Sequence, residues 1–241
     1  IACIAVSSLS SCCCTLCNKL DNESTPGTST DITPGASTSV SKNTPEPGQT
    51  GSEEEVKIDA LYYLSGKPPS GGTSEVTIRI SPNSKGELSV AFGESEARGT
   101  GDMWKSSGWM AVVLSTMLLG KKATDYEFYF GVKGKIDGPS AGCLMTAGVL
   151  AALRGQKIKE EVTMTGTINP DGTVGPVGGI PQKLEGAAKK GKKLVLVPAG
   201  ERTSLDMATN KPVDLVEKGK KLGIEVKEVS NIYDAYELLT G

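Results

Sequence analysis

The chain has 241 residues, with 26 Lys and Arg against 28 Asp and Glu, and it contains no histidine. A net charge of −2 gives no electrostatic reason to expect nucleic acid as a partner, and the absence of imidazole excludes a Ser-His-Asp catalytic triad. Residues 55–241 have ordinary domain size and can bury a core of their own, whereas the preceding residues differ in composition.

The N-terminal segment, residues 1–17, is apolar and holds five of the six cysteines. It is shorter than the roughly 20 apolar residues that span a bilayer, so we interpret it as the remnant of a signal peptide or of a membrane anchor that begins upstream. Leu9-Ser10-Ser11-Cys12 resembles a lipobox, which makes Cys12 a candidate for lipidation; a truncated, unstructured end is the alternative. Cys14 and Cys17 have the spacing of a metal-binding pair, but neither a second pair nor a histidine completes a zinc site, and we expect no metal and no other cofactor.

Residues 18–54 are dominated by Ser, Thr, Pro, Gly, Asn, Asp and Glu, with almost no large apolar side chain. Such a segment cannot bury enough apolar surface to offset its conformational entropy, so we expect a disordered linker. A stalk of this kind after an apolar segment is typical of a domain tethered outside a membrane. The expected location is therefore extracytoplasmic, either membrane-tethered or secreted.

The rest of the chain interleaves strand and helix patterns irregularly, which predicts a mixed α/β (α+β) fold. Strands are expected over residues 55–64, 74–81, 87–92, 125–132, 162–168, 173–177, 193–197 and 224–229. Helices are expected over residues 102–119, 139–153, 213–222 and 231–239, and in a short segment around Pro181 that ends before Gly191. The turn at residues 82–86 indicates a hairpin between the second and third strands, and Asp102 is the expected N-cap of the first helix.

Ser140 is the candidate nucleophile, because it lies on a Gly/Pro turn within the segment Asp137-Gly138-Pro139-Ser140-Ala141-Gly142. The predicted helix opens at this turn, so backbone N–H groups at Gly138, Ala141 and Gly142 are candidates for stabilising an oxyanion and contacting a substrate backbone. Asp137 is a candidate for orienting the loop, with plain surface exposure as the alternative. For Ser140 itself the alternative is a helix-capping residue without chemistry.

Lys183 is the candidate general base, because a serine nucleophile needs a group to take its proton and the chain offers no imidazole. Burial lowers the pKa of an amine, and a position in the first turn of a helix disfavours the cation further. Thr165 is a candidate for holding the amine by a hydrogen bond. The alternatives are a solvated surface lysine and an ordinary β-branched strand residue.

The segment around Ser140 is one of a series of motifs. The others are residues 101–107 (GDMWKSS), 164–168 (MTGTI), 172–183 (GTVGPVGGIPQK) and 193–198 (KLVLVP). In order and spacing these motifs make residues from about 56 to 241 resemble the proteolytic domain of the Lon proteases. The resemblance implies a fold of several small sheets and packed helices, a catalytic dyad of Ser140 and Lys183, and Thr165 as the residue that assists the lysine.

Lon proteases normally carry an ATPase module, but no G-x-x-x-x-G-K-[ST] phosphate loop occurs in this sequence. We therefore expect a stand-alone, ATP-independent serine endopeptidase that acts on unfolded or flexible proteins. The resemblance also implies a homo-oligomer, hexameric in the family. One alternative is a catalytically silent Lon-like scaffold or binding module. Another is a small-molecule kinase with a Gly/Ser-rich phosphate loop, in which the segment from Gly179 to Lys183 would have no role.

Overall fold

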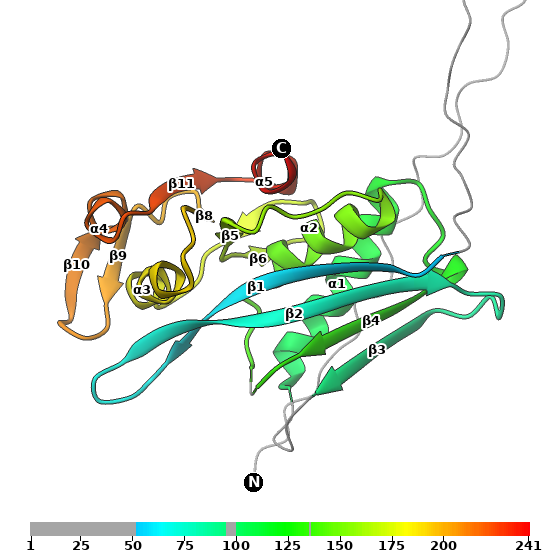
Figure 1. Cartoon of the computed structure of the whole chain (residues 1–241), viewed down its shortest axis with the longest axis horizontal. Helices are drawn as coiled ribbons and strands as arrows, with labels where there is room; N and C mark the ends of the chain where they lie inside the picture. Colours follow the sequence, from blue (N-terminus) through cyan, green and yellow to red (C-terminus); the bar gives the residue numbers. More distant parts are fainter. Residues whose placement is uncertain (1–51, 95–99, 135) are drawn as a thin grey trace, which may run out of the picture. The chain divides into compact units, whose positions relative to one another are not determined.

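The computed structural model of the chain describes residues 52–94, 100–134 and 136–241 (Figure 1). These residues all fall within one compact unit. Cys12, the other N-terminal cysteines and almost all of the expected linker lie outside the described residues, so the lipidation, anchor and linker assignments stay predictions. In the part of the chain that is described, no helix combines the length and the apolar character that a membrane crossing requires.

The largest sheet has four strands in the order β1-β2-β4-β3. Their bounds are Glu54–Leu64 for β1, Ser70–Pro82 for β2, Ser89–Glu94 for β3 and Tyr126–Val132 for β4. The expected hairpin between the second and third strands is wrong, because β2 pairs antiparallel with β4 and β3 joins the other side of β4 in parallel. A parallel pair needs a crossover connection, and the helix α1 (Asp102–Leu118), followed by a short 3-10 turn (Ala123–Asp125), supplies it here.

Two helices cover one face of this sheet (Figure 1). One is α1, and the other is α2 (Gly142–Leu153), in which every residue except Leu153 is buried. A helix that is apolar all round must be enclosed by other elements, and α2 contacts α1, β1, β2 and α5 (Ile232–Thr240). The N-cap of α1 is Gly101 rather than the expected Asp102, whose carboxylate lies in the first turn. The start of α2 also falls later than the expected residue 139.

The C-terminal part contains a parallel three-stranded sheet in the order β11-β8-β5. These strands span Glu225–Val229, Leu194–Pro198 and Val162–Met164. Around them lie the helices α3 (Ile180–Lys190) and α4 (Leu215–Leu222), and the two-stranded pairs β6 (Thr167–Ile168) with β7 (Val174–Gly175) and β9 (Thr203–Asp206) with β10 (Lys211–Asp214). The pair β9–β10 was not expected from the sequence.

The single strand expected over residues 162–168 is broken into β5 and β6, which belong to different sheets. Thr165 still donates its backbone N–H to the carbonyl of Leu196 in β8 at 3.0 Å, but the next amide, that of Gly166, donates to the carbonyl of Ser140 at 2.8 Å. The chain therefore leaves one sheet at Thr165 in order to hold the loop that carries Ser140.

Glycine-to-backbone packing fixes the position of α3. A Cβ atom added at Gly71 would lie 2.0 Å from the carbonyl oxygen of Gln182, and one added at Gly186 would lie 2.4 Å from the amide nitrogen of Gly72. Only glycine allows backbones to approach this closely. The start of β2 therefore supports the first turns of α3, where Lys183 lies.

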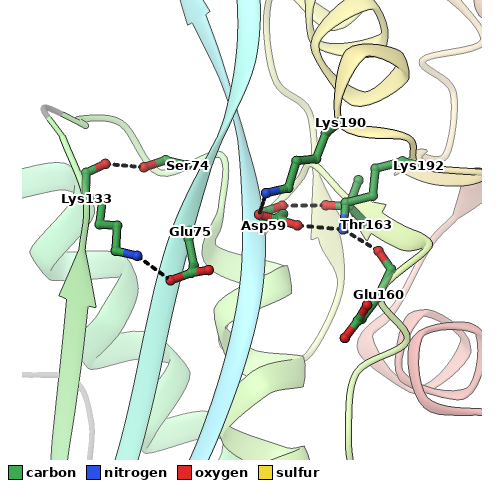
Figure 2. A network of polar contacts seen from close by, with 8 residues as sticks. All are labelled: Asp59, Ser74, Glu75, Lys133, Glu160, Thr163, Lys190 and Lys192. Carbon is green, nitrogen blue, oxygen red and sulfur yellow. Dashed lines mark hydrogen bonds and ion pairs between the residues drawn. The ribbon is translucent and has the colours of Figure 1, made fainter.

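A polar network joins the edge strand β1 to the second sheet (Figure 2). The carboxylate of Asp59 pairs with the amine of Lys192 at 2.8 Å and with that of Lys190 at 3.5 Å. Its backbone carbonyl accepts a hydrogen bond from the hydroxyl of Thr163 at 2.7 Å, and Lys192 also donates to the carbonyl of Glu160. These contacts hold β1 beside β5 in a place where no β-ladder connects the two strands.

Candidate active site

Ser140 lies in a turn that precedes α2, and its side chain borders a cavity of about 700 Å³. Gly138 enters the turn with φ of 102°, a left-handed conformation that favours glycine. The amide of Gly142 donates to the carbonyl of Pro139 at 3.0 Å, and the carbonyl of Ser140 is held from outside by Gly166. The serine is thus on a fixed, half-buried loop that faces an open space.

Lys183 borders the same cavity from the opposite element, the first turn of α3. Its residue is 3% exposed, so the surface-lysine alternative does not describe it. The amine donates to the hydroxyl oxygen of Thr165 at 3.0 Å, and the hydroxyl of Thr165 donates to the carbonyl of Ser140 at 3.3 Å. The structure therefore brings Ser140, Thr165 and Lys183 together, while their catalytic roles stay predictions.

Burial lowers the pKa of Lys183 below its ordinary value, to about 8. The carboxylate of Glu201 opposes this change but has the smaller effect. Burial in turn raises the pKa of Glu201, against the lowering effect of Lys183. An amine with this pKa has a substantial neutral fraction at mildly alkaline pH, as a general base requires.

The backbone donors near Ser140 divide into two groups. The amide of Gly138 donates to Oδ1 of Asp137 at 2.7 Å, and that of Gly142 is taken by Pro139. In contrast, the amides of Ser140 and Ala141 have no hydrogen-bond acceptor among the described residues and lie at the cavity wall. Of the three residues suggested for an oxyanion, this arrangement leaves Ala141 available, together with the amide of Ser140 itself.

Asp137 is exposed and contacts the loop rather than Lys183. A Cβ atom added at Gly101 would lie 2.0 Å from the carboxyl carbon of Asp137, so the carboxylate rests directly on the N-terminus of α1. This position and the hydrogen bond to Gly138 are consistent with the predicted orienting role of Asp137, which stays a prediction.

The remaining cavity walls come from residues to which the sequence analysis gave no role, although Thr167 and residues 176–179 lie within the motifs quoted there. They are Leu61 to Leu64 at the end of β1, Ile136, Thr167, Pro176 to Gly179, and Met207 in the turn between β9 and β10. Apolar side chains in a strand predict core rather than substrate contact, and no motif marks Met207. Most of these walls are apolar, which suits a peptide side chain.

Cys143 is a second nucleophilic side chain near the loop, but its environment keeps it inert. It is a free, fully buried thiol in the first turn of α2. Burial raises its pKa to about 12, so it remains a thiol rather than the reactive thiolate. Within the described ranges, no cluster of three or more His, Cys, Asp or Glu side chains is arranged to hold a metal ion.

Several known proteins are similar in sequence to this chain. Residues 131–235 match the family model of the Lon protease (S16) C-terminal proteolytic domain. Lon protease 2 of Bacillus subtilis (strain 168) is 33% identical over 142 residues, which cover 54% of this chain and 26% of that protein. The mitochondrial Lon protease homolog of Zea mays is 29% identical over 148 residues, covering 57% of this chain and 14% of that protein.

A shorter match is closer in sequence: Lon protease 1 of Sorangium cellulosum (strain So ce56) is 43% identical over 70 residues, which cover 29% of this chain and 9% of that protein. The aligned part is therefore about a quarter of the Bacillus subtilis protein and a smaller share of the other two. The motifs, the fold and these matches together identify residues 131–235 as a proteolytic domain of the Lon (S16) protease family.

Proposed function

We propose that this domain is an ATP-independent serine endopeptidase in which Ser140 is the nucleophile and Lys183 the general base. The observation that carries the proposal is the buried amine of Lys183, which has a lowered pKa, is held by Thr165 and borders the same cavity as Ser140. Burying an amine costs free energy. Among the described residues its hydrogen-bond acceptor is the neutral hydroxyl of Thr165, and the charge of Glu201 has a smaller effect on the amine than burial has. A chemical role accounts for this burial.

In the proposed reaction, the neutral amine takes the hydroxyl proton of Ser140 while the serine oxygen attacks the peptide carbonyl carbon. The amides of Ser140 and Ala141 stabilise the negative charge that forms on the carbonyl oxygen. The C–N bond then breaks as the protonated Lys183 gives its proton to the leaving amine, which leaves an acyl ester on Ser140. Lys183 next takes a proton from water, the hydroxide attacks the ester, and Ser140 regains its proton as the product acid leaves.

Thr165 supports the orientation of the base. A neutral amine has two N–H groups and one lone pair, and Thr165 accepts one of the N–H groups. Because the hydroxyl of Thr165 gives its own proton to the carbonyl of Ser140, it presents a lone pair to Lys183. The lone pair of the amine is then left for the proton of the nucleophile.

The strand β1 suggests how a substrate is bound. β1 is an edge strand, and the carbonyl of Asp59 points away from β2 toward Thr163. Backbone groups alternate sides along an antiparallel pair, so those of Leu61 and Tyr63 also point away from β2, at the wall of the cavity. An extended peptide can add to this edge as a further strand. Only unfolded or flexible segments of a substrate protein can adopt that extended conformation. The sequence contains no phosphate loop that would couple substrate unfolding to ATP.

The wider setting of the domain is part of the proposal as well. A tether through the N-terminal segment, lipidation at Cys12 and an extracytoplasmic location stay predictions from composition. Homo-oligomerisation, hexameric by family resemblance, stays a prediction of the same kind.

The direct test is incubation of the purified chain with unfolded casein in the absence of ATP, alongside Ser140→Ala and Lys183→Ala. We expect cleavage by the unchanged chain, no increase on adding ATP, and loss of cleavage in both variants. Labelling of Ser140 by a serine-directed covalent inhibitor distinguishes a peptidase from a silent Lon-like module. Cleavage that persists in Ser140→Ala would show that the nucleophile is assigned wrongly.

A further inference from the structure

The turn between β9 and β10 is organised by one buried carboxylate, that of Asp206, which is 7% exposed. Its Oδ1 atom accepts hydrogen bonds from the amides of Ala208 at 2.8 Å and Thr209 at 3.3 Å, both within the turn. The same oxygen also accepts from the side-chain amide of Gln182 at 2.9 Å. One atom thus connects the turn to the residue that directly precedes Lys183 on α3.

The second oxygen of the carboxylate extends the connection to α4. Oδ2 of Asp206 pairs with the amine of Lys218 at 3.4 Å, and Lys218 pairs with Glu185 of α3 at 2.6 Å. Burial raises the pKa of Asp206, but the amide of Ala208 and the charge of Lys218 lower it more, so the net pKa lies below its ordinary value. The carboxylate is therefore ionised at neutral pH and compensated on both oxygens.

The contact between Asp206 and Gln182 is more specific than surface packing. Gln182 is buried, and its carbonyl Oε1 has no hydrogen-bond partner in the described part of the chain. Leaving a buried oxygen unpaired is unfavourable, so packing alone does not explain an amide side chain at this position. The amide nitrogen of Gln182 has Asp206 as its acceptor.

Met207 follows Asp206 directly and borders the cavity that also contains Ser140 and Lys183. It is half-exposed, as is Leu205 on the other side of Asp206. Because Asp206 fixes the backbone on both sides of Met207, the methionine side chain has a defined place at the cavity wall. Apolar side chains in the wall of a binding pocket discriminate between substrate side chains of different size.

We propose that Asp206 is a positioning residue: it fixes Met207 as a specificity-determining wall of the substrate pocket and, through Gln182, holds the first turn of α3 that carries Lys183. The inference rests on the proposed peptidase function. According to this inference, the β9–β10 turn makes the enzyme prefer substrates with a large apolar side chain at the residue that precedes the cleaved bond.

The test compares two fluorogenic peptide amides that differ only in Leu or Ala before the scissile bond. We expect Met207→Ala to raise KM for the Leu peptide by about fivefold, with little change for the Ala peptide, as truncation of one apolar pocket contact does. Asp206→Asn and Gln182→Met should each reduce the Leu preference similarly and also lower kcat, by about tenfold, because α3 is displaced.

Asp171→Ala is the matched control. Asp171 also organises a turn, accepting from the amide of Thr173 at 3.0 Å and from its hydroxyl at 2.7 Å, but it contacts neither α3 nor the cavity. We expect it to change the melting temperature without changing the Leu preference. Equal selectivity in the unchanged chain, Asp206→Asn and Met207→Ala would overturn the inference.

Lys183 itself provides a readout that does not depend on peptide cleavage. In the Ser140→Ala background, reductive methylation of Lys183, measured by mass spectrometry over a pH series, reports the fraction of neutral amine. We expect Asp206→Asn to shift the midpoint to higher pH, because a displaced α3 admits water to the amine. If the unchanged chain cleaves nothing, the proposed function fails. A midpoint that Asp206→Asn leaves unchanged instead contradicts the positioning role.

Discussion

The amine of Lys183 lies 3.0 Å from the hydroxyl oxygen of Thr165. This contact joins the first turn of α3 to the break between β5 and β6, and the two residues are 18 positions apart along the chain. The same hydroxyl donates to the carbonyl of Ser140 at 3.3 Å, so one buried side chain connects the candidate base to the backbone of the candidate nucleophile. Thr165 therefore fixes the relative position of the two groups.

Replacing Thr165 by Val keeps the shape of the side chain and removes its hydroxyl. The amine of Lys183 then loses its acceptor and is free to rotate, and we expect kcat for peptide cleavage to fall by about tenfold to a hundredfold. Thr165→Ser retains the hydroxyl and is the matched control, with activity near that of the unchanged chain. Equal rates for the Val and Ser variants would show that the hydroxyl has no part in orienting the base.

Local sequence patterns were sufficient for the helices and most strands, because apolar periodicity and Gly or Pro boundaries are local signals. They also singled out Ser140 and Lys183 as candidates through their motifs, and the two residues border one cavity. They failed where pairing depends on distant contacts: nothing near residues 87–92 indicates that this strand pairs with β4 rather than β2. The break at Thr165 has the same origin, since it depends on hydrogen bonds to Leu196 and Ser140.

The cavity walls proposed to bind substrate could not be predicted, for a related reason. Leu61 and Tyr63 carry the alternation of an ordinary strand, and nothing in that pattern indicates that β1 is an edge strand bordering the cavity. Asp206 ends β9 and Met207 lies in the turn that follows, and this strand pair was not expected at all. Motifs mark the candidate nucleophile and the candidate base, whereas the walls around them arise from how separate elements pack.

The pH dependence of cleavage follows from the pKa of Lys183, which burial lowers to about 8. The reactive form is the neutral amine, so the rate should rise with pH, by about tenfold per unit well below pH 8, and level off above it. The measurement is kcat/KM from pH 6 to 10 with a substrate that has no titrating group. A rate that is constant over this range would be inconsistent with Lys183 as the base.

The same lowered pKa predicts an effect on stability. The pKa of Lys183 is about 8 in the folded protein and about 10.4 in the unfolded chain. Below pH 8 this difference lowers the free energy of unfolding by about 3 kcal/mol, because folding disfavours the protonated amine. This cost diminishes as the pH rises from 8 toward 10.4, because the unfolded state then also loses its proton. Lys183→Met should therefore stabilise the protein by up to about 3 kcal/mol at pH 7 and by much less at pH 10.

Denaturant unfolding at both pH values measures this difference. Lys189→Met, an exposed lysine on the same helix, is the matched control and should change the free energy of unfolding by less than about 0.5 kcal/mol at either pH. A Lys183→Met variant that is less stable than the unchanged chain at pH 7 would mean that the amine stabilises the fold.

The network around Asp59 predicts a large difference between two ion pairs that look alike (Figure 2). The side chain of Lys192 is 4% exposed, so Asp59→Ala leaves a buried charge without its carboxylate and should cost about 3 kcal/mol. Glu75 pairs with Lys133 at 2.9 Å, but the side chain of Lys133 is 74% exposed, and Glu75→Ala should cost less than about 1 kcal/mol. Chemical denaturation measures the free energy of unfolding of the two variants. Similar losses in both would show that burial of Lys192 does not make its ion pair with Asp59 more important for stability.

The packing of α3 on β2 predicts that one added methyl group will disturb the site. Gly71→Ala places a Cβ atom 2.0 Å from the carbonyl oxygen of Gln182, which is backbone and has no rotamer to move to. Helix α3 must therefore shift, and Lys183 moves with it relative to Thr165. We expect kcat to fall by about a hundredfold and the free energy of unfolding to drop by about 1 to 3 kcal/mol.

Ser70→Ala, which adds no atom at the neighbouring position of β2, is the control and should leave both quantities close to those of the unchanged chain. Full activity in Gly71→Ala would mean that the position of the lysine tolerates displacement of its helix, contrary to the requirement for a fixed base beside Ser140.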